Sequence, residues 1–353
     1  MHPLDHVNAS QSTNDVFPTA LRLAALVAIN DSVIPALDGL AKSLERLSAT
    51  HSRTVKAGRT HLMDAAPMTF GQEVGGWARS VRLGIDRLAG VRPRLCEIPL
   101  GGTAVGTGLN APNGFAGEVI DLLAADLGMP LREAVDHFEA QSAQEPLLEA
   151  SGAIRLVALS LFKIAGDLRI LSSGPNTGIA EIELPERQAG SSIMPGKVNP
   201  VIPEVVQQVA AQVVGNDAAI AFASATGSTL QLNTAMPVIG RNLMQSLQLV
   251  SAAATSLADK CIDELQVNVT TMSDYAHRSP AIAAALNPAL GYEAAARIAR
   301  RAMAEGRSIV EIAREAGDIS PELLQQLEPL RLALGPTASI DRPSRRQHQA
   351  RPQ

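Results

Sequence analysis

The residue types best suited to chemistry gather in one short stretch, residues 190–200, which reads Gly-Ser-Ser-Ile-Met-Pro-Gly-Lys-Val-Asn-Pro. Pro195 and Pro200 lack a backbone donor and the glycines loosen the backbone, so the stretch predicts a loop rather than a regular element. Lys197 and Asn199 suit the binding of a carboxylate, and a serine in a dry site can act as a base or nucleophile. We therefore expect a loop that carries chemistry.

Two other interpretations of this loop are an ordinary turn and a phosphate-binding loop. Most clusters of Gly, Pro and Ser are ordinary turns, and this alternative stays open on composition alone. A phosphate-binding loop is excluded by spacing. Five residues instead of four separate Gly190 from Gly196, and Val198 follows Lys197 where Ser or Thr is required.

Two other patterns resemble binding sites but favour a structural interpretation. The glycine-rich residues 101–108 follow no predicted strand and miss the Gly-x-Gly-x-x-Gly register, so close packing of a loop against helices is favoured over a dinucleotide cradle. His2 and His6 are four residues apart, but Pro3 opposes a helix start between them and no further ligand is evident. We assign no metal site.

Three blocks of the chain together resemble the fumarase/aspartase superfamily. Residues 190–200 are similar to its signature loop, and residues 2–15 and 58–65 resemble two further blocks in the family's order and approximate spacing. The resemblance extends from residue 2 to about residue 330. It implies a lyase that eliminates a group beside a carboxylate, acts on a small dicarboxylate, usually yields fumarate, and needs no cofactor.

The resemblance also implies roles for the polar residues of the loop. Ser191 would be the general base that removes a proton from the carbon beside the carboxylate. Ser192 would donate a hydrogen bond to the carboxylate on which charge accumulates. Lys197 and Asn199 would hold the other carboxylate, one as a point charge and one as an orienting donor.

Outside the loop, the resemblance assigns three more site residues. Thr60 would contact the substrate, and His61 would assist at the leaving-group side. Glu204 would pair with His61 and raise its basicity. From the residues alone, a lone histidine is more often structural than catalytic.

Ser12, Thr13 and Asn14 lie just before a predicted helix. Clusters of such residues usually cap the helix that follows them. The resemblance implies that they also bind the substrate carboxylate and the leaving group. The two roles are compatible, because a helix N-terminus is itself an anion site.

The choice of reaction within the superfamily depends on a few blocks. Several look like aspartate ammonia-lyases, namely residues 8–15, 203–206, 230–233, 237–240 and 287–293. Two look like class II fumarases, namely residues 58–65 and 137–141. We favour aspartate ammonia-lyase, with fumarate hydratase as the alternative. A third hypothesis, from another functional class, is that the protein is a non-catalytic relative of these enzymes.

Composition narrows the class of protein. The chain has 353 residues, of which 46% are hydrophobic and only 3% aromatic, and its net charge is −5. This composition favours closely packed helices over a β-sandwich and gives no sign of a nucleic-acid surface. No basic-then-apolar segment opens the chain, and no membrane span is expected. The two isolated cysteines are expected to be buried thiols, which fits a reducing cytoplasm.

Apolar residues recur at helical spacing in five long stretches, which predicts an all-α bundle. The first runs from about Leu23 to Leu47 with Pro35 inside it, so we expect a kink there. The others cover residues 69–95, 138–173, 200–224 and 237–262. The fourth carries a run of valines at four-residue intervals, Val201, Val205, Val209 and Val213.

We predict two domains and a tail. Residues 1–264 form a helical bundle that carries the motifs, residues 265–330 a small C-terminal helical domain, and residues 331–353 a disordered polar tail. The resemblance implies a homotetramer in which loops of three subunits build each active site. The chain begins on a block that family members place well inside their sequences. We therefore expect it to lack an N-terminal domain and, as written, to be weakly active or inactive.

Overall fold

The computed structural model describes residues 1–188, 194–316 and 319–335. The chain forms two compact units. Unit 1 contains Met1–Leu44, Trp77–Ile179 and Leu184–Gln266, and unit 2 contains Glu45–Gly76, Ala180–Glu183 and the chain from Val267 onward. Unit 2 therefore includes segments that lie, in sequence, inside the range 1–264.

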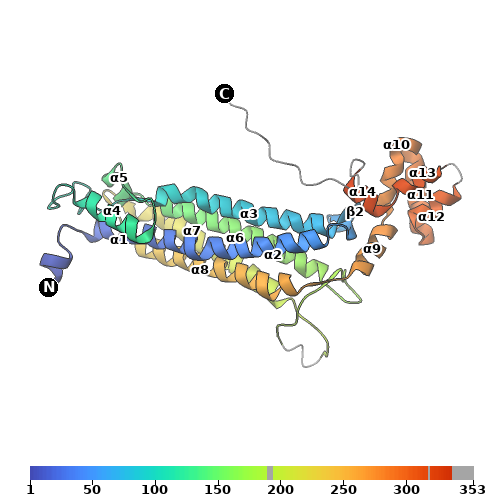
Figure 1. Ribbon diagram of the computed structural model, residues 1–353, viewed down its shortest axis with the longest axis horizontal. Helices are drawn as coiled ribbons and strands as arrows, with labels where there is room; N and C mark the ends of the chain where they lie inside the picture. The colour runs from blue at the N-terminus through green and yellow to red at the C-terminus, as the bar shows by residue number, and fades with distance from the viewer. Residues whose placement is uncertain (189–193, 317–318, 336–353) are drawn as a thin grey trace. The chain divides into compact units, whose positions relative to one another are not determined.

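Five long helical stretches make up most of unit 1, two of which extend into unit 2, and the predicted all-α fold is confirmed. They are α1 (Thr13–Ala28), which continues through the π-helical η2 (Ile29–Val33) into α2 (Ile34–Thr50), then α3 (Phe70–Leu95), α6 (Glu145–Leu171), α7 (Val201–Gly227) and α8 (Met236–Lys260). Helices α6, α7 and α8 pack on one another, and α1 packs on α6 and α8 (Figure 1). At the rise of an α-helix, the 27 residues of α6 span about 40 Å.

The first helix is interrupted just before Pro35. A proline cannot donate to the carbonyl four residues earlier, here that of Asp31, so the regular ladder must change in this turn. The structure places the π-helical turn there, and the N–H of Ile34 donates to the oxygen of Ile29, five residues back. The stretch Thr13–Thr50 is long and apolar enough to cross a membrane by length and composition. In this fold its first part packs on α6 and α8 inside the bundle.

Helix α7 buries a different face from the one that its valines suggested. Its buried residues are Pro203, Val206, Ala210, Val213, Asn216, Ile220, Ala223 and Gly227. They recur every three to four residues, as a 3.6-residue helix requires, whereas a strict four-residue interval drifts around the helix. Val205 is consequently 47% exposed in the single chain.

The predicted helix 138–173 is two helices, α5 (His137–Ser142) and α6. Asp136 starts α5 by accepting hydrogen bonds from the N–H groups of Phe138 and Glu139. Pro146, in the first turn of α6, has no N–H to continue the ladder of α5. The chain therefore turns at Ala143 and Gln144 before α6 begins.

Short elements complete unit 1. They are the π-turn η1 (Pro3–Val7), α4 (Phe115–Leu127), the 3-10 turn η3 (Ile262–Glu264), the parallel pair β3 (Glu97–Ile98) and β4 (Arg132–Glu133), and the antiparallel pair β6 (Ser228–Thr229) and β7 (Leu232–Asn233). Both cysteines, Cys96 and Cys261, are free and buried, as expected. Burial raises the pKa of the Cys261 thiol to about 12.

Unit 2 combines a β-hairpin with small helices. The hairpin is β1 (Val55–Thr60) and β2 (Met63–Thr69), and β5 (Ile182–Glu183) pairs with β8 (Gln266–Val267). The helices are α9 (Val269–Arg278), η4 (Pro280–Leu286), α10 (Asn287–Leu290), α11 (Tyr292–Glu305), α12 (Ile309–Glu315), α13 (Pro321–Gln326) and α14 (Pro329–Leu334). Aliphatic side chains of η4, α11 and α12 form a common core with Leu327.

Candidate active site

At the start of α1, Ser12 caps the helix, whereas Thr13 and Asn14 are its first two residues. Ser12 is the N-cap, and its Oγ accepts a hydrogen bond from the N–H of Asn14 at 3.2 Å. Asp15 completes a capping box, because its Oδ1 accepts from the N–H of Ser12 at 2.9 Å. Asn14 donates from Nδ2 to the oxygen of Ala104 at 2.8 Å. Thr13 is exposed at the first helical position.

Asp15 is a residue of this region that the sequence marks as a possible helix cap but to which it gives no role in the site. It is 0% exposed, and its Oδ2 accepts hydrogen bonds from the N–H groups of Gly101 and Thr103, each at 3.0 Å. One carboxylate therefore joins the start of α1 to the loop 99–108. The Ser-x-x-Asp spacing of a capping box was the available signal.

The glycines of residues 101–108 are explained by packing, as the sequence favoured. A Cβ on Gly101 would lie 2.4 Å from the Cβ of Ala116, and one on Gly102 would lie 2.2 Å from Oε1 of Gln141. Gln141 in turn donates to the oxygen of Thr103 at 2.8 Å. At these two positions the loop lies too close to α4 and α5 for a side chain.

Thr60 and His61 lie at the tip of the β1–β2 hairpin. Thr60 pairs with Met63, and the two residues between them, His61 and Leu62, have φ of 55° and 62°. Two successive left-handed residues define the tight turn that suits the twist of a hairpin, but glycine or asparagine usually occupies it. A leucine in this conformation is uncommon, and such strain clusters at functional sites. The imidazole of His61 is presented on an exposed, sharply defined turn.

Gly58 shapes the hairpin behind this turn. The register of β1 and β2 shifts between Ala57 and Arg59. A Cβ on Gly58 would lie only 2.6 Å from the oxygen of Ala66. Irregular pairing of this kind changes the direction in which the following side chains point.

A cluster of charged side chains lies at the base of the same hairpin. Lys56 Nζ is 2.6 Å from Glu73 Oε2 and 2.8 Å from Glu181 Oε2, and Arg59 Nη1 is 2.9 Å from Glu181 Oε1. The Arg59 guanidinium also lies over the ring of Tyr275, 5.6 Å from its centre. Lys56 and Glu181 are 1% and 0% exposed. The sequence analysis did not foresee this cluster, because Glu181 is far in the chain from Lys56, Arg59 and Glu73.

The loop that carries the signature block is described in part. Ser191 and Ser192 lie outside the described residues, so their predicted roles stay predictions. Lys197 and Asn199 are exposed, and the oxygen of Asn199 accepts from the N–H of Val201 at 2.8 Å as α7 begins. Upstream, Arg187 donates from Nε to the oxygen of Lys260 at 3.0 Å and forms an ion pair with Glu264.

Glu204 lies in the first turn of α7, beside the end of α6. Its Oε1 is 3.8 Å from Nη2 of Arg169, and Arg169 also donates to Oε1 of Gln207 at 2.6 Å. His61 belongs to unit 2 and Glu204 to unit 1. The predicted pairing of His61 with Glu204 stays a prediction.

Within unit 1, one chain does not bring its predicted site residues together. The start of α1 lies at one end of the bundle, and the yellow-green stretch that leads into α7 lies at the other (Figure 1). The contacts agree, because Asn14 reaches the loop that packs on α5, whereas Glu204 adjoins Arg169 near the end of α6. The length of α6, about 40 Å, therefore separates Ser12–Asn14 from Lys197–Glu204.

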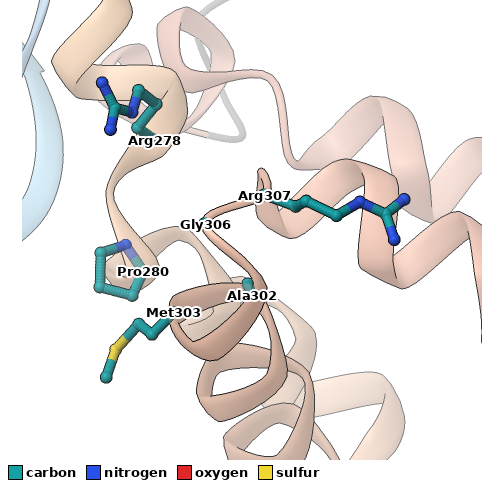
Figure 2. A pocket seen from close by; sticks show the side chains of 6 residues that line it. All are labelled: Arg278, Pro280, Ala302, Met303, Gly306 and Arg307. Carbon is teal, nitrogen blue, oxygen red and sulfur yellow. The ribbon is translucent and has the colours of Figure 1, made fainter.

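The structure also contains a hollow of about 200 Å³ in unit 2, lined by Arg278, Pro280, Ala302, Met303, Gly306 and Arg307 (Figure 2). The Arg307 guanidinium turns away from it (Figure 2) and is paired with Glu305 and Glu315. No predicted site residue lines the hollow. Among the described residues there is also no group of His, Cys, Asp and Glu that could hold a metal ion.

Comparison with known proteins places this arrangement in a family. Residues 1–215 match the family described as Lyase, and residues 282–332 match the family described as Fumarase C C-terminus. The chain belongs to the fumarase/aspartase superfamily. The fumarate hydratase class II of Corynebacterium glutamicum is 48% identical over 93% of this chain and 69% of its own length. That of Mycobacterium tuberculosis is 50% identical over 92% of this chain and 68% of its own length.

Solved structures of this superfamily share the fold. A fumarate lyase:delta crystallin from Brucella melitensis superposes with a TM-score of 0.90 at 44% identity, covering 94% of this chain and 72% of its own. A class II fumarase from Schistosoma mansoni superposes with a TM-score of 0.89 at 34% identity, covering 94% and 73%.

These relatives correct the reaction favoured from the sequence. Aspartate ammonia-lyase was wrong, because relatives 45–50% identical over most of the chain are fumarate hydratases class II. The fumarase-like blocks, residues 58–65 and 137–141, were the better guide. A physical reason is that malate and aspartate share both carboxylates, so residue types suited to a carboxylate do not distinguish the two substrates. Only a few contacts distinguish a hydroxyl from an ammonium leaving group.

Proposed function

We propose that the protein is a fumarate hydratase that interconverts fumarate and L-malate. The observation that carries this proposal is the 48% and 50% identity to class II fumarate hydratases over more than nine-tenths of the chain. The residues to which the resemblance gives roles are all present, including Thr60-His61, the Ser191-Ser192 pair and Lys197-x-Asn199.

The chemistry follows from the residue types. In the dehydration direction Ser191, as base, takes a proton from the malate carbon beside one carboxylate, and the electron pair moves into that carboxylate as an enediolate. The hydroxyl then leaves the neighbouring carbon with a proton, as water, and His61 serves at this side. Lys197 and Asn199 hold the other carboxylate. Donors aimed at the enediolate lower the barrier, because that charge is absent from the substrate.

We further propose that the site is shared between copies in a homotetramer. Groups that lie at opposite ends of one bundle can meet only if another copy supplies the missing end. The single chain leaves large apolar side chains exposed along α6 and α7, namely Leu156, Leu159, Phe162, Ile170, Val205, Val214 and Phe222. Complete burial of a side chain of this size contributes about 1.5–3 kcal/mol, and covering the exposed part of each contributes a fraction of that. This face therefore suits association with identical helices.

Product analysis tests the proposed function. The purified full-length protein is given fumarate in a buffer that contains ammonium, and the products are identified by proton NMR. We expect malate and no aspartate. Ser191→Ala should lower the rate of malate formation at least about a hundredfold, as loss of a general base does. Aspartate as the product, or a Ser191→Ala variant of normal rate, would contradict the proposal.

A further inference from the structure

The charged cluster along the β1–β2 hairpin, formed by Lys56, Arg59, Glu73 and Glu181, is unfavourable to bury. Removing an ion from water costs several kcal/mol even after the protein relaxes, and apolar residues of equal volume often stabilise a fold as well. Lys56 and Glu181 are nevertheless almost completely buried. Unlike apolar packing, an ion cluster fixes the orientation of the groups that it joins. The two oxygens of Glu181 meet different cations, Oε2 facing Lys56 and Oε1 facing Arg59, and so fix β1 at two points.

Arg59 lies next to the turn of the hairpin, so a restraint on Arg59 acts close to Thr60 and His61. Arg59 directly precedes Thr60, and the left-handed residues His61 and Leu62 follow. A left-handed conformation is strained for a residue with a side chain. Ala180, next to Glu181, is also left-handed with φ of 49°. Strained backbone on both sides of one ion pair persists only where the surroundings hold it.

Glu181 also lies on a segment that leads toward the signature loop. Its backbone oxygen accepts a hydrogen bond from the N–H of Asn268 at 3.0 Å, which anchors the segment to the start of α9. The chain then continues from Glu183 to Arg187 and the loop that carries Lys197. One carboxylate thus ties the hairpin of Thr60 and His61 to the segment that enters the loop.

We propose that Glu181 is a positioning residue for Thr60 and His61 and acts through Arg59. Its carboxylate fixes the register of β1, and thereby the direction in which the turn presents the His61 imidazole. Glu181 itself touches no substrate. The inference rests on the proposed function, because hydration of fumarate is the reaction that His61 serves.

Steady-state kinetics give the first test. Glu181→Gln keeps the shape of the side chain and removes its charge. We expect kcat for L-malate to fall about 10–100-fold, since small misplacements of reacting groups have effects of this size. KM should change less than about threefold, because the carboxylate-binding loop residues are untouched. Glu73→Gln is the matched control, because Glu73 is partly exposed and pairs with Lys56 but not with Arg59. It should stay within about twofold of wild type.

A double-variant cycle separates positioning from general loss of structure. In a His61→Ala background, Glu181→Gln should cause no further loss of kcat, because its effect passes through His61. A loss of equal factor with and without His61 would overturn the proposal. So would a Glu181→Gln variant whose kcat is within about twofold of wild type. Arg59→Lys keeps the positive charge and should give an intermediate loss, which supplies a second variant if Glu181→Gln does not fold.

Hydrogen exchange tests the same inference without using activity. We expect Glu181→Gln to speed amide exchange in peptides covering residues 55–69, while Glu73→Gln leaves them unchanged. This readout distinguishes the two proposals. If the protein forms no malate but the hairpin loosens, the proposed function fails while the structural tie stands. Unchanged exchange in the hairpin of Glu181→Gln would overturn the positioning role.

Discussion

At the residue scale, single buried polar groups fix the segments that carry the site. Asp15 accepts three backbone N–H groups from two segments that are more than 80 residues apart. Its position could be foreseen only in part. The capping box with Ser12 is visible in the sequence, but the bonds to Gly101 and Thr103 require the fold. The same holds for Glu181, which no local pattern marks, because its partners Lys56 and Arg59 lie over 120 residues earlier.

Asp15→Asn tests this function of a buried carboxylate. The amide retains one acceptor oxygen and turns an NH2 group toward backbone donors, so at least one buried N–H loses its partner. We expect the free energy of unfolding to fall by about 1–3 kcal/mol, measured by urea denaturation. Asp31→Asn is the control, because Asp31 is exposed, and it should change stability by less than about 0.5 kcal/mol. Equal stabilities of the two variants would refute the assigned role.

At the element scale, the long helices were predictable and the hairpin was not. Helices α3, α7 and α8 begin and end within three residues of the predicted bounds, because their apolar periodicity is long and their ends carry Pro or Gly. The hairpin β1–β2 has little alternation and a His-Leu turn without glycine or asparagine. Tertiary contacts hold that turn, so the local sequence gives no signal for it. The roles predicted for Thr60 and His61 therefore rest on resemblance alone.

The ion pairs between the small helices of unit 2 predict how the stability of the fold changes at acid pH. The Arg301 and Arg307 side chains lower the pKa of Glu305 and Glu315 below the ordinary value of 4.5. Carboxyl groups with a lowered folded pKa stabilise the folded state fully above the unfolded pKa. That contribution is lost as the pH falls through the folded value.

Arg307→Gln removes one shared partner of both carboxylates. We expect this variant to melt below wild type at about pH 7, with a small difference because these pairs are exposed. The difference should shrink below about pH 4 and in high salt. Arg300→Gln, at an exposed position on the preceding helix α11, controls for loss of charge. A melting difference that does not depend on pH would contradict the ion-pair assignment.

At the scale of the whole molecule, the separation of site residues within one bundle predicts complementation. If a site combines loops from different copies, an Asn14→Ala subunit and a Lys197→Ala subunit, changed at opposite ends of the bundle, can together form some sites that lack both changes. Each variant alone should be nearly inactive. Co-expressed hybrids should recover part of the malate turnover, measured by ultraviolet absorbance of fumarate. No recovery in hybrids shown by mass spectrometry to contain both subunits would place each site within one chain.

The most direct test of the account is the ratio of kcat/KM for L-malate to that for L-aspartate, followed in both cases by fumarate formation. The two substrates share their carboxylates and differ only in the leaving group, so the ratio isolates the contacts that define the reaction. A site built for a hydroxyl leaving group should favour malate by more than about 100-fold. A ratio near one, or faster fumarate formation from aspartate, would contradict the proposal that the protein is a fumarate hydratase.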